Sequence, residues 1–419
     1  MKVLLLNTHD INGGAARAAY RLHQGLQNIG VDSQMLVQSR LSNDSTITGP
    51  KTRLKESIAH NRIAIDALPL KFYGNRDKST FSLQWLPEKT TLDIAKVNPD
   101  LINLHWINEA FLQVENLAKL DKPLVWTLHD MWAFTGGCHY TQGCNKYEDF
   151  CGSCPQLSST RNWDLSRWVW HRKSQSWSKI NFTIVALSSW LAKCARSSNL
   201  FQNQRIELIP NGIDTQKYKP TSRDVARKLL NLPLDKKLIL FGSLHATSDK
   251  RKGFYLLQPA LQQLSQSRWN DKLELAIFGS SKPSNPPELG FPTHYLGQFN
   301  DDLSLALVYC AADVFVLPSA EDNLPNTVME ALACGIPCVA FNIGGMPDLI
   351  EHQQNGYLAQ PYHIEDLAQG IAWILENQER YQKISHRARE KVEHEFTLAI
   401  QARRYSALFE DIIARNNIS

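Results

Sequence analysis

The chain has 419 residues, a length that predicts roughly two to three domains. Hydrophobic residues make up 43% of it and charged residues 21%, which is typical of globular proteins and excludes disordered, collagen-like and small disulfide-rich chains. No apolar run reaches the roughly 18 residues of a membrane-spanning helix, and the first apolar run is too short for a secretion signal. We therefore expect a cytoplasmic protein whose eight cysteines are reduced or bound to metal.

Charge is distributed unevenly along the chain. Residues 1–210 hold 24 Lys and Arg against 17 Asp and Glu, a balance of +7, whereas the remainder holds 21 against 24, a balance of −3. Halves of opposite sign indicate two domains with different partners. One interpretation is that the basic half makes peripheral contact with the inner face of the plasma membrane; an ordinary solvated surface is the alternative.

Short apolar runs alternate with stretches of helical period along the whole chain. The predicted strands are 3–6, 101–104, 124–128, 182–187, 206–209, 238–241, 273–278, 314–317 and 336–341. The predicted helices are 15–29, 253–264, 303–312, 327–333, 364–375 and 378–413. Strands buried on both faces and separated by helices predict two parallel sheets, each in an α/β domain.

The turn-rich sequence from Pro210 to Asp214 marks the predicted domain boundary. We expect an N-terminal domain over 1–210 with a Cys-rich insertion at about 135–160, and a second domain over 211–395. A C-terminal helix over 396–419 is expected to cross back to the N-terminal domain. A ligand is expected at the carboxyl ends of the strands, between the two domains.

Paired glycines follow the first predicted strand and open the first predicted helix. Gly13 and Gly14 allow backbone amides to approach an anion closely, and the helix N-terminus adds positive potential. The sequence therefore predicts either a phosphate-binding turn or a tight turn without a ligand. The spacing is not G-x-G-x-x-G, so a dinucleotide fingerprint is absent.

An acidic loop follows the predicted strand 314–317 and leads into a helix. Asp322 lies on the loop and Glu330 about two turns into the helix, so both can face one ligand and contact different parts of it. Carboxylates accept paired hydrogen bonds, which suits the vicinal hydroxyls of a sugar. Without its flanking residues, this spacing more often marks only a charged helix N-terminus.

With its flanking residues, Asp322-x7-Glu330, continued as Glu-Ala-Leu-Ala-Cys-Gly, resembles the signature of glycosyltransferase family 4, the GT-B class of retaining enzymes. The resemblance implies an α/β fold of two doubly wound Rossmann-like domains that face each other across a cleft. Most members have Glu at the position of Asp322, and Glu321 precedes it here. Either acid is therefore a candidate to meet the transferred sugar, and the register favours Asp322.

The same resemblance implies how the donor diphosphate is bound. Family members use the lysine of a Lys-Gly pair, which Lys252 matches, and an arginine upstream of it. Ser243 replaces that arginine, so Arg251 or Lys250 is expected to take its role. Three cations at a helix entrance form a strong anion site, although a solvated basic turn is the alternative.

The resemblance also implies the remaining roles. Glu330 would hold the ribose, while Asp322 and His129 would orient the sugar, so that His129, Lys252 and Asp322 are the expected catalytic residues. Further residues expected around the donor are Gly13, Gly14, Gly279, Gly297, Glu321, Asn326, Gly344 and Gly345.

Polar side chains end two neighbouring predicted strands of the N-terminal domain. His129 ends strand 124–128, where a lone histidine is more often structural than functional, and the resemblance implies contact with the donor sugar. Asp130, which follows it, and His105-Trp106 at the end of strand 101–104 are expected to line the acceptor side.

Four cysteines lie within a Gly-rich loop after His129: Cys138-x5-Cys144-x6-Cys151-x2-Cys154. Their number and the C-x2-C pair fit a tetrahedral structural zinc site, with two disulfides or buried thiols as alternatives. The loop resembles one found in polysaccharide-assembly members of colanic-acid type.

Tryptophans and cations interleave between residues 161 and 179. This pattern can mark a membrane interface or a nucleic-acid surface, but we favour a helix whose tryptophans pack under the cysteine loop. Because no nucleic-acid recognition module accompanies it, no nucleic-acid partner is expected.

Together these features predict a retaining hexosyltransferase that moves a sugar from a nucleoside-diphosphate sugar to a glycan, lipid-linked or small-molecule acceptor, in polysaccharide or glycoconjugate biosynthesis. No cofactor is expected for catalysis, because the D-x-D of metal-dependent transferases is absent; a structural Zn²⁺ is expected at the cysteines. The alternatives are a nucleotide-sugar epimerase or phosphorylase of similar shape, or a non-catalytic nucleotide-sugar-binding protein.

Overall fold

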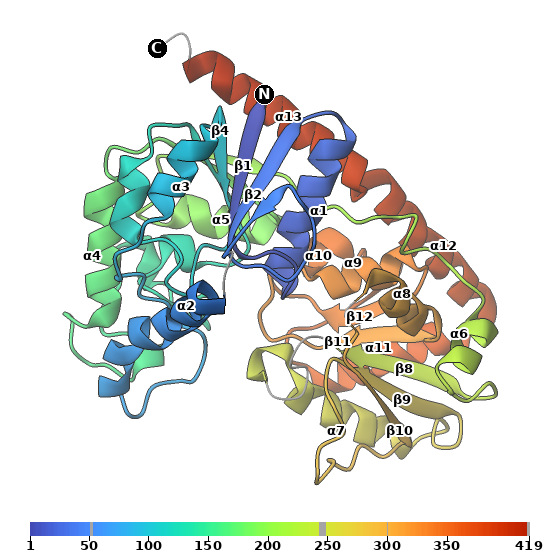
Figure 1. Ribbon diagram of the computed structural model, residues 1–419. Coiled ribbons are helices and arrows are strands. Elements are labelled where there is room, and N and C mark those ends of the chain that lie inside the picture. Colours follow the sequence, from blue (N-terminus) through green and yellow to red (C-terminus); the bar gives the residue numbers. More distant parts are fainter. Residues whose placement is uncertain (51–52, 243–248, 300, 417–419) are drawn as a thin grey trace. The chain divides into compact units, whose positions relative to one another are not determined.

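The computed structural model describes residues 1–50, 53–242, 249–299 and 301–416, and the chain divides into two compact units (Figure 1). The first unit comprises Met1–Pro210 together with Gln401–Ser419, and the second comprises Asn211–Ile400. Each unit is built on one parallel sheet. The predicted α/β architecture of two Rossmann-like domains is confirmed.

The sheet of the first unit has the strand order β3-β2-β1-β4-β5-β6-β7. Its strands are β1 (Lys2–His9), β2 (Asp32–Ser39), β3 (Ile47–Thr48), β4 (Leu101–Leu104), β5 (Leu124–Leu128), β6 (Phe182–Ala186) and β7 (Arg205–Leu208). Its helices are α1 (Gly14–Asn28), α2 (Arg53–Asp66), α3 (Thr90–Val97), α4 (Leu165–Trp177), α5 (Ser189–Ser197) and, from residue 401, α13 (Leu398–Asn416).

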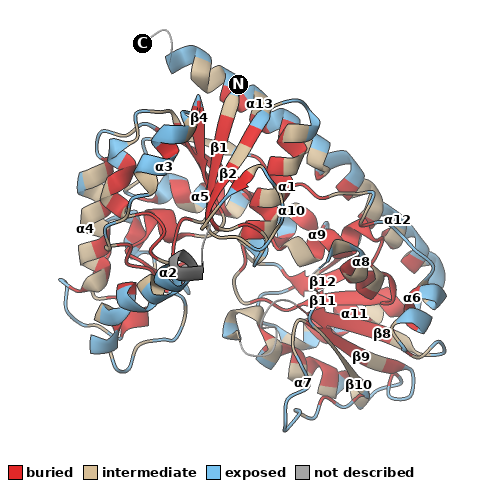
Figure 2. Ribbon diagram, viewed as in Figure 1, coloured by how far each residue is buried: buried red, intermediate tan, exposed pale blue. Residues whose placement is uncertain are grey.

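Alternation along β1 divides the core of this unit into two layers, one on each face of the sheet. Val3 and Leu5 pack with Tyr405 of α13, whereas Leu4 and Leu6 pack in a separate cluster on the other face. A parallel strand covered on both faces is apolar at every position, which explains the unbroken run in the sequence and the continuous burial in Figure 2.

The sheet of the second unit has the strand order β10-β9-β8-β11-β12-β13. Its strands are β8 (Lys237–Gly242), β9 (Leu273–Phe278), β10 (Thr293–Gly297), β11 (Val314–Leu317), β12 (Cys338–Phe341) and β13 (Gly356–Ala359). Its helices are α6 (Arg223–Leu229), α7 (Phe254–Ser265), α8 (Asp302–Cys310), α9 (Asn326–Ala333), α10 (Met346–Leu349), α11 (Ile364–Glu376) and α12 (Gln378–Glu395).

Several elements differ from the sequence expectation, among them helices α2, α3, α5, α6 and α10, which were not predicted. Strands β2, β3, β10 and β13 were not predicted, because their residues are shorter or less apolar runs than the central strands. The stretch 378–413, predicted to be helical, consists of two helices, and the chain leaves the helical conformation at Phe396 and Thr397. There the Ile213 amide donates to Phe396 O (2.8 Å) and the Leu398 amide donates to Ile213 O (3.1 Å). These extended-chain bonds replace the helical ones.

Candidate functional site

Three turns of the second unit meet at Asp322. The basic turn η6 (Lys250–Lys252) lies beyond the end of β8, the acidic loop follows β11, and the Gly344–Gly345 turn follows β12. Lys252 Nζ is 2.7 Å and Arg251 Nη1 is 3.4 Å from Asp322 Oδ2, and the Gly345 amide donates to Asp322 O at 3.1 Å. Because these strands are neighbours in a parallel sheet, their carboxyl ends bring distant parts of the sequence together.

Two glycines allow these turns to approach so closely. At Gly253, where φ is +74°, an added Cβ would lie 1.8 Å from Pro318 O. At Gly344, where φ is +53°, it would lie 2.0 Å from Asp322 O. Both obstacles are backbone atoms, so any side chain would force the turns apart. The glycines therefore hold the basic and acidic loops in contact.

The ion pair at this edge is partly buried. Only 5% of Asp322 is exposed, whereas Lys252 and Arg251 are half-buried. Burial raises the carboxyl pKa of Asp322, but the charges of Lys252 and Arg251 outweigh burial and hold that pKa below the usual value. Burial, followed by the charge of Arg251, lowers the pKa of the Lys252 ammonium. An incoming anion would share the Lys252 ammonium with Asp322.

The other predicted acids occupy distinct positions. Glu330 is 2% exposed in the second turn of α9, where the Tyr309 hydroxyl donates to its Oε2 at 2.9 Å. Glu321 is half-buried, and its carbonyl accepts a hydrogen bond from Arg251 Nη1 at 3.1 Å. Asn326, the first residue of α9, pairs with Asn211 Nδ2 at 3.1 Å.

Tyr309 is a contact that sequence reasoning missed. It is fully buried on α8 and packs edge-on against the rings of Phe278 and Phe315, which fixes its hydroxyl toward Glu330. In the sequence it looks like an ordinary apolar position of a helix, and nothing marks Glu330 as its partner.

The other predicted donor-side glycines lie at strand ends of the same sheet. The Gly279 amide at the end of β9 donates to Gly297 O at the end of β10, at 2.7 Å. Ser243, the position of the missing arginine, lies outside the described residues, as do its neighbours to residue 248.

In the first unit, four predicted residues come together at the ends of the adjacent strands β4 and β5. His105 Nδ1 is 3.0 Å from His129 Nε2, and the two rings stack with centroids 5.3 Å apart. Trp106 Nε1 donates to Asp130 Oδ2 at 2.9 Å. The side chains thus form two hydrogen-bonded pairs, His105 with His129 and Trp106 with Asp130, each of which joins the end of β4 to the end of β5.

The two histidines are neutral at pH 7. Burial lowers the pKa of His129 to about 4, against the opposing charge of Asp130. Burial, followed by the neighbouring His129, lowers the pKa of His105 well below its ordinary value. Each ring therefore offers one N–H donor and one nitrogen lone pair rather than a positive charge.

Asp130 links this edge to the cysteine loop. Its Oδ2 is 2.6 Å from His139 Nδ1, and the other nitrogen of that ring is 2.9 Å from Ser82 Oγ. Burial raises the pKa of Asp130, but the charge and hydrogen bond of His139 outweigh burial and lower it. Sequence reasoning missed His139 as a partner of Asp130, although it directly follows Cys138.

The paired glycines of the first unit stand where predicted, between β1 and α1. Gly13 adopts φ +94° and its carbonyl accepts the Arg17 amide at 3.0 Å, while α1 begins at Gly14. Sequence reasoning missed the buried Asp10, whose carboxylate accepts the amides of Leu41 (3.0 Å) and Ser42 (2.7 Å). It could not have been paired with them, because strand β2 was not predicted.

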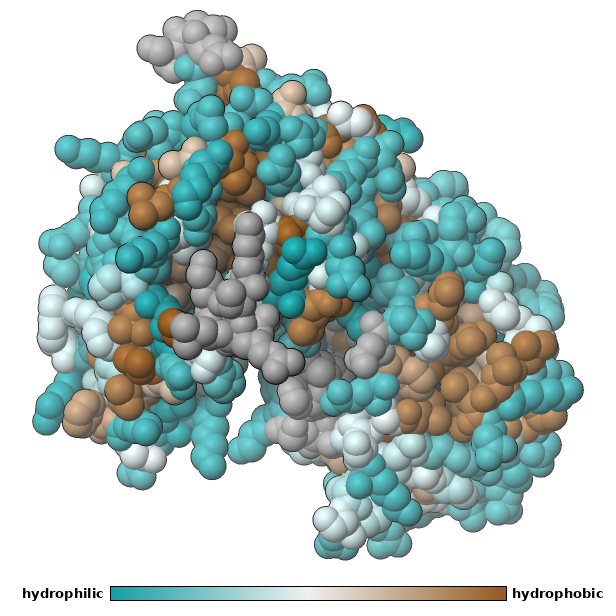
Figure 3. Space-filling view, in the orientation of Figure 1, coloured by the Kyte–Doolittle hydropathy of each residue, from teal (hydrophilic) through white to brown (hydrophobic). Residues whose placement is uncertain are grey.

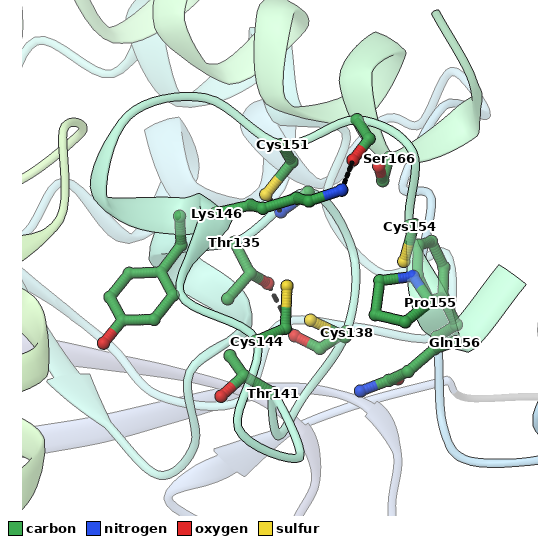
Figure 4. Close-up of a pocket in the computed structure, with 14 residues that line it drawn as sticks. Thr135, Cys138, Thr141, Cys144, Lys146, Cys151, Cys154, Pro155, Gln156 and Ser166 are labelled. Atoms are coloured by element: carbon green, nitrogen blue, oxygen red, sulfur yellow. Dashed lines mark hydrogen bonds between the residues drawn. The ribbon is translucent and has the colours of Figure 1, made fainter. Parts of the chain in front are cut away.

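The four predicted metal ligands, Cys138, Cys144, Cys151 and Cys154, line one small cavity of the first unit (Figure 4). None of them forms a disulfide. Among the residues that the structure describes, no three His, Cys, Asp or Glu side chains converge closely enough to hold a metal ion as they stand.

The tryptophan-rich segment is helix α4, and its packing confirms the interpretation of a helix under the cysteine loop. Trp168 packs against the cluster that contains Cys138 and Cys154, and Trp177 is buried in the main core. Trp163, which precedes the helix, differs: it is 64% exposed.

Two family models match the chain. "Glycosyltransferase Family 4" matches residues 12–217 and "Glycosyl transferases group 1" matches residues 222–391. Between them, these two models cover nearly the whole chain, which therefore belongs to the glycosyltransferases that they describe. Its resemblance to the family, read from Asp322 and Glu330, is thereby confirmed.

Relatives of this family match over different lengths. A protein of Escherichia coli K12 described as a colanic acid biosynthesis glycosyl transferase is 25% identical over 380 residues, which cover 84% of this chain and 85% of that protein. A sulfoquinovosyl transferase of Arabidopsis thaliana is 28% identical over 215 residues, or 48% of this chain and 40% of the relative. Thus the chain spans less than half the length of several relatives that it matches.

Solved structures of other proteins share the fold of this chain. Sucrose-phosphate synthase of Thermosynechococcus elongatus has a TM-score of 0.69 at 20% identity, covering 99% of this chain and 100% of that one. HepE of Anabaena in complex with UDP-glucose has a TM-score of 0.66 at 16% identity, covering 98% and 100%. Across the described ranges of this family member, no helix is long and apolar enough to cross a membrane.

Proposed function

We propose that the protein is a retaining glycosyltransferase that moves a hexosyl unit from a nucleoside-diphosphate sugar to an acceptor hydroxyl, without a metal ion at the catalytic centre. The observation that carries the proposal is the cluster of Lys252, Arg251 and Asp322 at one edge of the second sheet. The loop of Asp322 leads into α9, which carries Glu330. Half-buried cations at a parallel-sheet edge suit a diphosphate.

The proposed roles follow from charge. Cleavage of the donor leaves negative charge on the diphosphate oxygen and positive character on the sugar. Lys252 and Arg251 would stabilise the leaving group, and fixed charge at a developing anion is usually a large catalytic contribution. Glu330, oriented by Tyr309, would accept hydrogen bonds from the ribose hydroxyls.

We propose that the cluster of the first unit serves the sugar and the acceptor. His105, Trp106 and His129 offer neutral donors and acceptors of hydrogen bonds, and the Asp130 carboxylate adds an acceptor; such groups suit uncharged hydroxyls better than phosphates. The Gly13–Gly14 turn at the N-terminus of α1 would add backbone donors for the diphosphate.

The colanic acid relative, which matches over most of both chains, supports a role in polysaccharide biosynthesis, with a glycan or lipid-linked acceptor. A relative named as a galactosyltransferase acting on a diphosphoundecaprenol-linked sugar supports a lipid-linked acceptor, although it is only 23% identical.

A donor screen tests this function. The purified protein is incubated with UDP-, GDP- and ADP-hexoses, with and without an alkyl-glycoside acceptor and with EDTA throughout. We expect slow release of one nucleoside diphosphate, faster release with acceptor, and a product with the anomeric configuration of the donor. Isomerised donor, phosphate-dependent cleavage, or binding without turnover would instead indicate an epimerase, a phosphorylase or a binding protein.

We also propose peripheral contact with an anionic membrane through α2 and η1 (Leu68–Phe72). This segment exposes the apolar side chains of Ile65 (43%), Leu68 (46%) and Phe72 (89%) beside the exposed Lys71. Apolar side chains flanked by cations suit the boundary between headgroups and acyl chains. The basic balance of residues 1–210 would add attraction at low salt.

The membrane proposal has a matched control in the second unit. Figure 3 shows another apolar patch, over α6 and α8, to which Val225, Leu229 and Leu303 contribute exposed side chains. We expect Phe72→Ser to reduce cosedimentation with phosphatidylglycerol vesicles at low salt, and Leu229→Ser to leave it unchanged. Equal binding by both variants and the wild type would reject α2 and η1 as the contact.

A further inference from the structure

The four cysteines of the loop after β5 lie around one cavity, although the loop has almost no regular secondary structure. Figure 4 shows their sulfur atoms on the walls of this cavity, with Cys151 and Cys154 from one turn and Cys138 and Cys144 from the preceding segment. All four are free thiols. Four thiols around one small space are the ligand set of a tetrahedral zinc site.

The turn that carries the C-x2-C pair is held by hydrogen bonds to its backbone. Lys146 Nζ donates to Gly152 O (3.0 Å) and Ser153 O (2.7 Å), and the Cys154 amide donates to Asp164 Oδ2 (2.8 Å). Asp164 also caps α4, so this carboxylate joins the turn to the helix. The protein itself therefore holds the turn in place, through Lys146 and Asp164, without a metal ion.

A backbone amide already points at one sulfur. Gly136 N–H donates to Cys151 Sγ at 3.1 Å, the kind of outer contact that orients and stabilises a metal-bound thiolate. A Cβ at Gly136 would lie 2.6 Å from Cys151 Cβ and 2.3 Å from Ser166 O, so only glycine permits this approach. The close approach of the Gly136 backbone to Cys151 therefore depends on the absence of a side chain at position 136.

A buried cation lies beside the cavity. Lys173 of α4 is fully buried; its ammonium donates to Thr135 O (3.0 Å) and to Trp132 O, and lies 3.6 Å from the centre of the Trp132 ring. Burial lowers the pKa of this ammonium well below its ordinary value, and Cys151, Cys138 and Asp130 act in the opposite direction. Asp130 is already paired with His139, and carbonyl oxygens carry no net charge.

A buried ammonium is costly without a compensating negative charge. Neutral thiols do not supply one, whereas a zinc ion held by four thiolates is a net negative group. We propose that Cys138, Cys144, Cys151 and Cys154 bind one structural Zn²⁺, and that Lys173 is the buried counter-cation of this site. Because the sulfurs do not converge as they stand, ligation requires the side chains to turn from the walls toward the centre of the cavity.

The proposed site would stabilise the acceptor-side edge. His139 directly follows Cys138 and holds Asp130, and Gly137 O accepts the amide of Ser82, the residue that contacts the other nitrogen of His139. Zinc would thus fix the loop that orients Asp130. The metal site itself does not depend on the proposed transfer reaction, and its test is independent of activity.

The test is metal and thiol analysis of the full-length protein, purified without chelator or added metal. We expect about one Zn²⁺ per chain by mass spectrometry. All eight cysteines should react with a thiol reagent after denaturation in EDTA without reductant. Replacement by Co²⁺ should give the visible bands of tetrahedral thiolate coordination. Eight reactive thiols with no bound metal would overturn the proposal, as would fewer than eight, because that result indicates disulfides.

Two serine variants locate the metal. Cys154→Ser should lower the zinc content several-fold and reduce the melting temperature by roughly 10 °C. Cys194→Ser, a half-buried cysteine of α5 outside the cavity, should retain one zinc ion. If Cys154→Ser does not fold, the cobalt spectrum of the wild type still decides. The Lys173→Met variant should also lose zinc, and unchanged zinc affinity in that variant would remove Lys173 from the site.

Discussion

Both units place their candidate site residues at the carboxyl edge of a parallel sheet, but the two edges differ in charge. At the edge of the first unit, His105 and His129 are neutral and paired with each other, whereas at the edge of the second unit Lys252 and Asp322 form a partly buried ion pair. Neutral groups suit the hydroxyls of a sugar, and cations suit a diphosphate. The carboxyl edge of a parallel sheet therefore gathers side chains, and burial and pairing decide which ligand chemistry they fit.

The largest expected effect removes the charge of the second edge. Lys252→Ala should lower kcat for donor hydrolysis by roughly 100- to 1,000-fold, because a cation at the leaving group is lost. Lys383→Ala, on the exposed face of α12, is the matched control and should leave kcat unchanged. Steady-state kinetics with the preferred donor measure both. Retained turnover in Lys252→Ala would show that this edge does not stabilise the leaving group.

The pH dependence of stability tests the neutrality of the first edge. The folded pKa of His129 is about 4 and its ordinary value is 6.5, so between these pH values the unfolded chain binds more protons. Stability should therefore be full above about pH 6.5 and fall as the pH drops toward 4. His129→Gln should reduce the slope of unfolding free energy against pH by at most about 1.4 kcal/mol per pH unit. Urea titrations at several pH values measure this slope, and an unchanged slope would contradict a buried neutral His129.

A smaller effect is expected when the orientation of Glu330 is changed and the cations of the second edge are kept. Tyr309→Phe keeps the buried ring but removes the hydroxyl that donates to Glu330. The donor KM should rise roughly tenfold with little change in kcat, because Glu330 would lose its orientation while the cations remain. Tyr255→Phe, at an exposed position of α7, is the control. An unchanged donor KM would mean that Glu330 does not depend on Tyr309.

The smallest expected effect concerns Trp163, the exposed member of the tryptophan group. Trp163→Ala should change the unfolding free energy by less than about 0.5 kcal/mol, whereas Trp177→Ala, which empties a core position, should cost roughly 3–5 kcal/mol. Chemical denaturation of both variants provides the comparison. A large loss for Trp163→Ala would mean that its side chain has a packing role in solution.

The central strands and most helices could be predicted, because fully buried parallel strands leave unbroken apolar runs. The edge strands β10 and β13 could not, since β10 is half-exposed and β13 begins with a glycine and lacks an unbroken run of large apolar residues. The hydrogen bonding at the break between α12 and α13 could not be predicted either. The break depends on hydrogen bonds to Ile213, nearly two hundred residues earlier in the chain.

By itself the sequence determined the family, the two parallel sheets and the residue types at each strand end, because these depend on local pattern and spacing. Only the tertiary structure decided that Lys252 pairs with Asp322, that Tyr309 serves Glu330, and that the two histidines share one hydrogen bond. Such pairs join residues distant along the chain, here 70 positions for Lys252 and Asp322. The strand order sets which turns meet, and the surrounding packing sets how far each group is removed from water. Neither property can be read from the residues of a single segment.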